Sequence, residues 1–142
     1  MSLPRPKKRH PESAIQIAIV ELLAMILLPG AIVHASLNEE ASPTRRMINA
    51  AMGACAGFAD LLIIWRGLIL LMEVKTADGR QSPAQERFQA DVEALGWRYV
   101  IVRSVDDALA AVQASGIPHR VVSAAGVPAA RMRLAVKGAA CR

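Results

Sequence analysis

Hydrophobic residues recur along the chain at two different spacings, which separate helices from strands. Over residues 12–28 they recur every three or four positions, which is the period of a helix with one buried face, and Pro29-Gly30 ends the pattern. Shorter apolar runs, bounded by polar or glycine-containing segments, predict strands. These runs are residues 31–35, 58–65, 68–75 and 97–103.

Two further helices are predicted from their start signals. Ser82-Pro83-Ala84-Gln85 places a capping Ser, a Pro at the first helical position and a Gln that can complete a capping box, so a helix should run to Leu95 and stop at Gly96. Ser104 to Asp107 repeats the box before a helix over 108–114. Residues 36–57 show no sustained period, which predicts a long loop with about one helical turn, and residues from 116 on predict a weakly ordered tail.

The resulting order of elements is α, β, β, β, α, β, α, which is typical of an α/β protein with a mixed sheet flanked by helices. A chain of 142 residues is long enough for one domain, and its hydrophobic fraction of 54% allows a sizeable core. We expect a basic arm over 1–11, a folded domain over 12–112 and a basic tail over 113–142.

The two central strands carry the first candidate chemistry. Arg66-Gly67 is a two-residue connection, so the strands should form an antiparallel hairpin in which Trp65 faces Leu68 and Asp60 faces Glu73. Opposed carboxylates about 5 Å apart repel by roughly 3 kcal/mol at an effective dielectric near 20. Lys75 lies on the face of Glu73, and a divalent metal between the carboxylates would replace the remaining repulsion by coordination.

A different hairpin register would leave Asp60 and Glu73 as separate solvated charges and Lys75 as an ordinary surface cation. The residues around them argue against this alternative. Residues 61–64 and 68–72 are too apolar for an exposed sheet, so the three charges should lie at the end of a buried hairpin. Charged groups in such a place are costly unless they are used.

Charge is distributed unevenly along the chain. All 12 acidic residues, but only 8 of the 17 Lys and Arg residues, lie within 12–112. Basic flanks of this kind favour a polyanionic partner, although they also occur as solvated tails. The candidate phosphate-binding residues are Lys7, Lys8 and Arg9 in the arm, and Arg45 and Arg46 in the long loop.

Several other classes of protein are disfavoured. Cys55 and Cys141 show neither disulfide nor zinc spacing, which favours a reducing, cytoplasmic setting. The apolar run after Lys7, Lys8 and Arg9 resembles an export signal, but Glu21 interrupts it. No stretch of about 18–20 residues is free of charges or breaks, so we expect no membrane span.

An ordered series of motifs resembles a known nuclease domain. The motifs are Gly57-Phe58-Ala59-Asp60-Leu61, then Glu73-Val74-Lys75, then Gly79-Arg80-Gln81-Ser82-Pro83-Ala84-Gln85 with Phe88, and finally Gly96-Trp97-Arg98-Tyr99 and Val102-Arg103-Ser104. Over about residues 12–112 they resemble a stand-alone VRR-NUC domain of phage or bacterial type, a branch of the PD-(D/E)XK nuclease superfamily. One departure is Ala59, where the family usually has Pro.

The resemblance implies a restriction-endonuclease-like core in αβββαβ order and a set of site residues. Asp60, Glu73 and the Val74 carbonyl would bind Mg²⁺ or Mn²⁺, and Lys75 would orient the attacking water. Glu12 would match the helical acid that holds a metal-bound water or a second ion. Gln85 would match the motif Gln of the family and is a further candidate catalytic residue. Plainer interpretations stay open for three residues, since Glu12 could complement the helix dipole, Gln85 could serve only the capping box and Gln16 could be solvated.

The function implied by the resemblance is a metal-dependent, structure-selective DNA endonuclease of replication and repair. It would hydrolyse phosphodiester bonds in branched DNA, of Holliday-junction or flap type, and act as a homodimer, with Gln16 contributing to DNA binding one turn after Glu12. The main alternative is a catalytically inactive nucleic-acid-binding module on the same fold. A secreted or membrane-associated protein is the third hypothesis.

Overall fold

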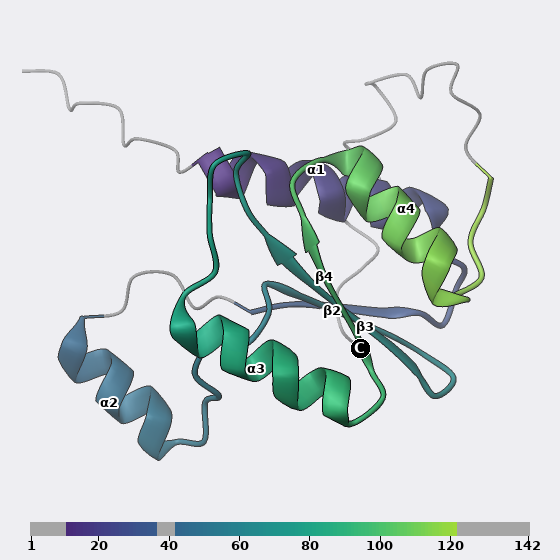
Figure 1. Ribbon diagram of the computed structural model, residues 1–142. Helices are drawn as coiled ribbons and strands as arrows, with labels where there is room; N and C mark the ends of the chain where they lie inside the picture. Colours follow the sequence, from purple (N-terminus) through teal and green to yellow (C-terminus); the bar gives the residue numbers. More distant parts are fainter. Residues whose placement is uncertain (1–10, 37–41, 122–142) are drawn as a thin grey trace, which may run out of the picture.

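Helices and strands alternate along the chain, and the strands form one sheet with helices on both sides (Figure 1). The computed structural model describes residues 11–36 and 42–121. In these residues the elements are α1 (Pro11–Ile26), β1 (Ile32–Ala35), α2 (Pro43–Ala51), β2 (Leu61–Trp65), β3 (Leu68–Val74), α3 (Pro83–Ala94), β4 (Arg98–Val102) and α4 (Val105–Ser115). The fold is α/β with a mixed sheet, as the sequence predicts.

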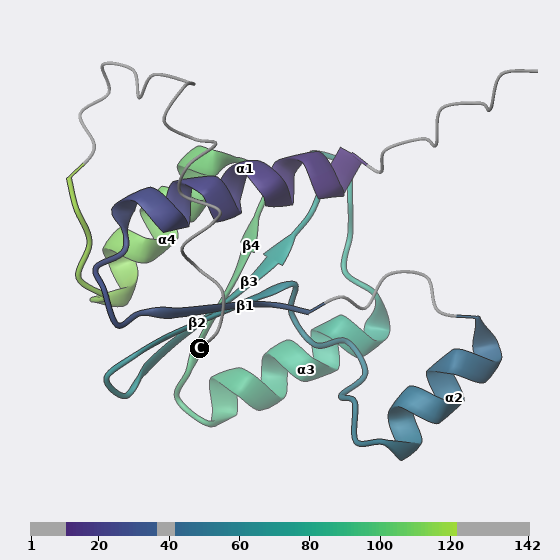
Figure 2. The ribbon, with the colours of Figure 1, turned by 180° about the vertical axis from the view of Figure 1, so that it is seen from behind.

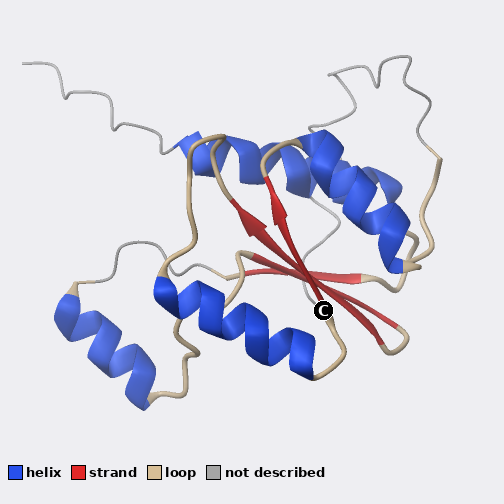
Figure 3. Cartoon of the chain, in the orientation of Figure 1, coloured by secondary structure: helices blue, strands red, loops and turns tan. Residues whose placement is uncertain are grey.

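The four strands lie in the order β1-β2-β3-β4 across the sheet. β1 pairs antiparallel with β2, β2 pairs antiparallel with β3, and β4 lies parallel to β3. A parallel neighbour requires a crossover, and α3 provides it (Figure 3). α3 therefore covers one face of the sheet, and α1 and α4 cover the other, as the two opposite views show (Figures 1 and 2).

The register of the central hairpin is the one predicted from its two-residue turn. Pairs run from Trp65↔Leu68 to Leu61↔Met72. Arg66 and Gly67 both have left-handed backbone angles, with φ of 38° and 82°, as the tightest hairpin turns require. The open end of the hairpin, where β2 begins and β3 ends, lies opposite this turn.

Successive residues of β3 point to opposite faces of the sheet, and each face has its own hydrophobic core. Leu70 and Met72 are fully buried against α1 and α4 in the larger core. Leu71 belongs to a smaller core with Ala59, Val92 and Tyr99 on the side of α3. By the same alternation Glu73 lies on the α3 side, where the motif residues gather.

Helix α1 follows the predicted period closely. It buries Ile19, Leu22, Leu23 and Ile26 and ends two residues before the predicted position. No helix in the described ranges is long and apolar enough to cross a membrane.

The predicted loop over 36–57 is wrong in part, because α2 occupies nine residues of it. Ser42 caps α2 by accepting a hydrogen bond from the Arg45 N–H at 3.3 Å, and Pro43 fills the first turn. None of its residues is buried, and Met47 is 75% exposed. The helix does have an apolar side, which includes Met47 and Ile48, but this side is exposed and the pattern spans only nine residues. The Ser-Pro start signal is the clearer cue to this helix.

The chain after α4 also has more structure than expected. Gly116 ends α4 with φ of 79°, and Ile117 is 1% exposed in the larger core. His119 then pairs with Leu27, and the Arg120 N–H donates to the Ile26 carbonyl at 2.7 Å. Residues 117–120 thus close over the end of α1, so the prediction of a weakly ordered tail is wrong here.

The exposed position of His34 is a third local difference. An apolar strand suggests that a histidine in it is buried in the core, yet β1 is an edge strand and His34 is exposed. His34 pairs with Leu62 on β2, and the alternate residue Val33 packs against the core instead.

The Gly57→Ala variant should destabilise the protein by about 3 kcal/mol. Gly57 has φ of 74°, and a Cβ there would stand 2.4 Å from the carbonyl of Ala84 at the start of α3. Backbone strain costs roughly 1–2 kcal/mol and overpacking a further 1–3 kcal/mol. Gly96→Ala is the matched control, because Gly96 has φ of 80° and no atom within 4 Å of the added Cβ. Urea unfolding of both variants measures the difference, and equal losses would contradict the close packing of Gly57 on α3.

Candidate active site

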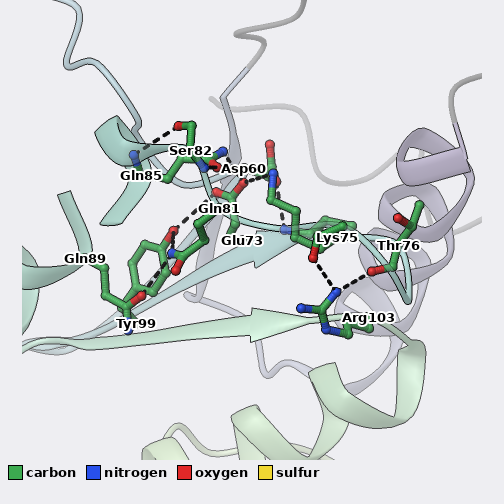
Figure 4. A network of polar contacts seen from close by, with 12 residues as sticks. Asp60, Glu73, Lys75, Thr76, Gln81, Ser82, Gln85, Gln89, Tyr99 and Arg103 are labelled. Atoms are coloured by element: carbon green, nitrogen blue, oxygen red, sulfur yellow. Dashed lines mark hydrogen bonds and ion pairs between the residues drawn. The ribbon is translucent and has the colours of Figure 1, made fainter. Parts of the chain in front are cut away.

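Three charged side chains meet at the open end of the hairpin. Glu73, near the end of β3, is 1% exposed, and Lys75, just beyond β3, is 9% exposed. The Lys75 Nζ lies 3.1 Å from the Glu73 Oε1. Asp60, immediately before β2, completes the group (Figure 4). The sequence therefore brings two carboxylates and one ammonium group together in a largely buried place.

Asp60 is held through both its backbone and its side chain. Its carbonyl accepts a hydrogen bond from the Ser36 N–H at 2.8 Å. Its Oδ2 accepts one from the Val74 N–H, also at 2.8 Å. The regular pairing of β2 with β3 ends at Leu61, and the side chain of Asp60 reaches the next backbone N–H on β3.

The Glu73 carboxylate has hydrogen-bond donors at both oxygens. The Gln85 Nε2 donates to Oε1 at 2.5 Å, and the Tyr99 hydroxyl lies 3.4 Å from Oε2 (Figure 4). Gln85 also completes the capping box of α3, since its Oε1 accepts from the Ser82 N–H at 2.8 Å. The two interpretations of Gln85 left open by the sequence are therefore compatible: one end of the amide caps the helix and the other contacts Glu73.

Burial makes the negative charges of this group costly. It raises the pKa of Glu73 from 4.5 to about 7, and the charge of Asp60 adds to the shift, while Lys75 opposes it. Burial also raises the pKa of Asp60, against the opposing effects of the Val74 N–H and Lys75. Two carboxylates share one ammonium group, so a further positive charge would stabilise their ionised forms.

The oxygen ligands at this site fit a hard divalent cation. Among residues 11–36 and 42–121, no three or more His, Cys, Asp or Glu side chains group closely enough to hold a metal ion. The available ligands are thus two carboxylates with backbone oxygens. Mg²⁺ is commonly bound by one or two carboxylates together with waters and substrate phosphates, so the residues fit this ion or Mn²⁺.

The fold of this chain is similar to that of a solved protein. That structure is titled "VRR_NUC domain protein"; it superposes with a TM-score of 0.61 and 23% sequence identity, over 77% of this chain and 90% of the other. The two chains share one fold. Comparison with known protein families gives no match, and neither does comparison with curated proteins.

Glu12 is a further predicted site residue that approaches Asp60 and Glu73. It lies in the first turn of α1, half-buried, and its negative charge raises the pKa of Asp60. Its Oε1 is 3.3 Å from the place where a Cβ on Gly79 would stand. Glu12 therefore lies beside the loop that follows Lys75, at the edge of the site. Gln16 is half-buried one turn further along α1, and the roles of both stay predictions.

Two of the predicted phosphate-binding residues, Arg45 and Arg46, lie on α2 and not in this cluster. Both arginines are exposed. In both ribbon views α2 lies to one side of the sheet and of the other helices. Lys7, Lys8 and Arg9 lie outside the described residues, and their role stays a prediction.

Two residues near the site belong to the motifs quoted above but were given no role at the site from the sequence. Arg103 donates from Nη1 to the carbonyls of Thr76, Ala77 and Gly79, which fixes the loop after Lys75. Tyr99 is buried beside Glu73. A tyrosine in an apolar strand needs a partner for its hydroxyl, and this signal could have drawn attention to it.

In EDTA, which removes metal ions, the free energy of unfolding should fall as the pH rises from about 4.5 to 7, the range in which Glu73 titrates. In the folded state Glu73 keeps its proton up to about pH 7, whereas in the unfolded chain it loses it near 4.5. The folded state binds more protons between these values, so the free energy of unfolding decreases from about pH 4.5 to 7. We expect a loss of about 1–2 kcal/mol, allowing for solvent screening.

Glu73→Gln should remove most of this pH dependence and be more stable than wild type at pH 8. Glu86→Gln is the matched control, because Glu86 is exposed in the first turn of α3. Urea unfolding at pH 5, 6, 7 and 8 provides the measurement. Parallel pH curves for wild type and Glu73→Gln would show that Glu73 is not the titrating group.

Proposed function

We propose that the protein is a metal-dependent nuclease that hydrolyses phosphodiester bonds in DNA. The observation that carries the proposal is the burial of Glu73 next to Lys75 and the half-buried Asp60, where the pKa of Glu73 rises to about 7. Strongly shifted acids beside a cation are typical of catalytic sites. The similarity of the fold to a VRR_NUC domain protein supports the same class of activity.

Asp60, Glu73 and the Val74 carbonyl would bind Mg²⁺ or Mn²⁺. The N–H and C=O of one strand residue point to the same side of the strand, and the Val74 N–H points to Asp60. The Val74 carbonyl therefore lies on the side of the carboxylates. When bound, the cation would stabilise negative charge on the phosphate and lower the pKa of a coordinated water.

Lys75 would orient the attacking water and stabilise the charge that develops on the phosphate oxygens. The Glu73 Oε1 holds its ammonium group near the proposed metal position. Gln85 would keep the same carboxylate in place, and Glu12 would hold a metal-bound water or a second ion at the edge of the site.

The substrate we propose is branched DNA, of Holliday-junction or flap type, in replication or repair. The resemblance of the motifs supports this choice, and so does the lack of a base-reading element in the sequence. A homodimer would present two such sites to a two-fold symmetric junction. An inactive DNA-binding module is the alternative, and its signature would be metal-independent binding without cleavage.

Asp60→Asn should reduce cleavage at least about 100-fold, because it removes a charged ligand while keeping the side-chain volume. The assay uses end-labelled four-way junctions, flaps, duplexes and single strands, each with Mg²⁺, with Mn²⁺ or with EDTA. Asp78→Asn is the control, since Asp78 is exposed in the loop after Lys75. If wild type binds DNA but cuts none of these substrates with either metal, the alternative holds.

Replacing both Arg45 and Arg46 by Gln should weaken DNA binding without changing which substrate is preferred. If each contacts one phosphate, the slope of log affinity against log salt decreases by about 2 in magnitude. Arg98→Gln is the control, because Arg98 is exposed at the start of β4, away from the open end of the hairpin. Fluorescence anisotropy in Ca²⁺ at several salt concentrations gives the slopes. An unchanged slope would exclude α2 from the DNA-binding surface.

A further inference from the structure

A buried tyrosine hydroxyl lies against the candidate metal ligand Glu73. Tyr99 is on β4, whose parallel pairing with β3 places it beside Leu71, two residues before Glu73 and on the same face. Tyr99 is 6% exposed, and its hydroxyl is 3.4 Å from the Glu73 Oε2. The hydroxyl also lies 3.3 Å from the Gln81 Nε2.

The contact with Gln81 determines which way the Tyr99 hydrogen points. An amide Nε2 can only donate, so the Tyr99 oxygen is the acceptor in that contact. Its own hydrogen then remains for Glu73, whose ionised carboxylate can only accept. Burial and the negative charge of Glu73 both raise the pKa of Tyr99, which keeps the phenol protonated.

The amide of Gln81 is itself held in one orientation. Its Nε2 donates to the Gln89 Oε1 at 2.9 Å, and the Gln89 Nε2 donates to the Glu93 Oε1 at 2.9 Å. Gln89 and Glu93 lie one turn apart on α3. The hydrogen bonds therefore diverge from the Gln81 amide, through Gln89 to Glu93 on one side and through Tyr99 to Glu73 on the other. Rotation of the Gln81 amide would break contacts on both sides (Figure 4).

Each oxygen of Glu73 consequently has its own donors. Oε1 receives hydrogen bonds from Gln85 and Lys75, and Oε2 receives one from Tyr99. Rotation of the carboxylate would break contacts at both oxygens. Hydrogen bonds of this kind orient metal ligands in many proteins and contribute substantially to metal affinity.

We propose that Tyr99, oriented by Gln81, is a positioning residue that holds the Glu73 carboxylate in its metal-binding orientation. The inference rests on the proposed function, since it assigns Glu73 to the metal. It adds a residue from a different strand and a directed set of side-chain amides to the site. Tyr99 itself contacts neither metal nor substrate.

Tyr99→Phe tests the proposal with little change in packing. The ring of Tyr99 packs edge-on against Phe88 at 6.2 Å, and Phe88 lies 4.8 Å from Phe58, so a phenylalanine ring keeps these contacts. In a Mn²⁺ titration of the DNA-free protein followed by electron paramagnetic resonance, we expect the variant's Kd to rise about tenfold. Saturating Mn²⁺ should restore the cleavage rate, because the hydroxyl acts on metal binding and not on the reaction.

Gln81→Met tests the orienting role of the amide. Alone it should raise the Kd for Mn²⁺ by a smaller factor, because the hydroxyl stays but can rotate. In the Tyr99→Phe background it should add nothing, because both changes act through one hydroxyl. If the two factors multiply instead, Gln81 does not act through Tyr99. Phe88→Leu is the packing control, and it should leave the Kd unchanged.

The outcomes separate this inference from the proposed function. If wild type binds Mn²⁺ and cuts DNA while Tyr99→Phe binds Mn²⁺ equally well, the inference is wrong and the proposed function stands. It is also wrong if Phe88→Leu weakens Mn²⁺ binding as much as Tyr99→Phe, since ring packing would then explain the effect. If wild type binds no Mn²⁺, the proposed function fails and the inference fails with it.

Discussion

The burial of two carboxylates beside a single ammonium group is the constraint that organises this structure. The apolar residues of β2 and β3 remove water from Asp60 and Glu73, and Lys75 balances only one of the two charges. The free energy cost appears as the rise of the Glu73 pKa to about 7. A proton or a divalent cation relieves it, so the site has an affinity for positive charge before any substrate arrives.

Three separate elements of the fold each contribute one donor to this pair. The hairpin supplies the Val74 N–H to Asp60, the parallel strand β4 supplies the Tyr99 hydroxyl, and α3 supplies the Gln85 amide. Gln85 links two functions, since the amide that caps α3 also holds Glu73. A change in the position of α3 would therefore move the carboxylate, and the close packing of Gly57 on the start of α3 limits such a change.

The parts of this arrangement that depend on local signals were predictable from sequence. The Arg66-Gly67 turn fixed the register of the hairpin, and Ser82 with Gln85 fixed the start of α3. Contacts that depend on the parallel pairing of β4 with β3 were not predictable, because that pairing is set by packing across α3. Tyr99 and Arg103 reach the site only through it. Helix α2 was missed because its apolar pattern spans only nine residues.

Ala59 stands where the VRR-NUC domains that the motifs resemble usually have proline, and the contacts around it bear on this difference. A proline at position 59 would fix its own φ and restrict the backbone of Phe58 before it. Here Ala59 is fully buried in the core beneath α3, and Asp60 is bound to Ser36 through its carbonyl and to Val74 through its side chain. Two hydrogen bonds on opposite sides, one from the chain that follows β1 and one from β3, fix the position of Asp60. The rigidity that proline would provide is therefore supplied by the neighbouring chain, and alanine leaves the acidic pair in place.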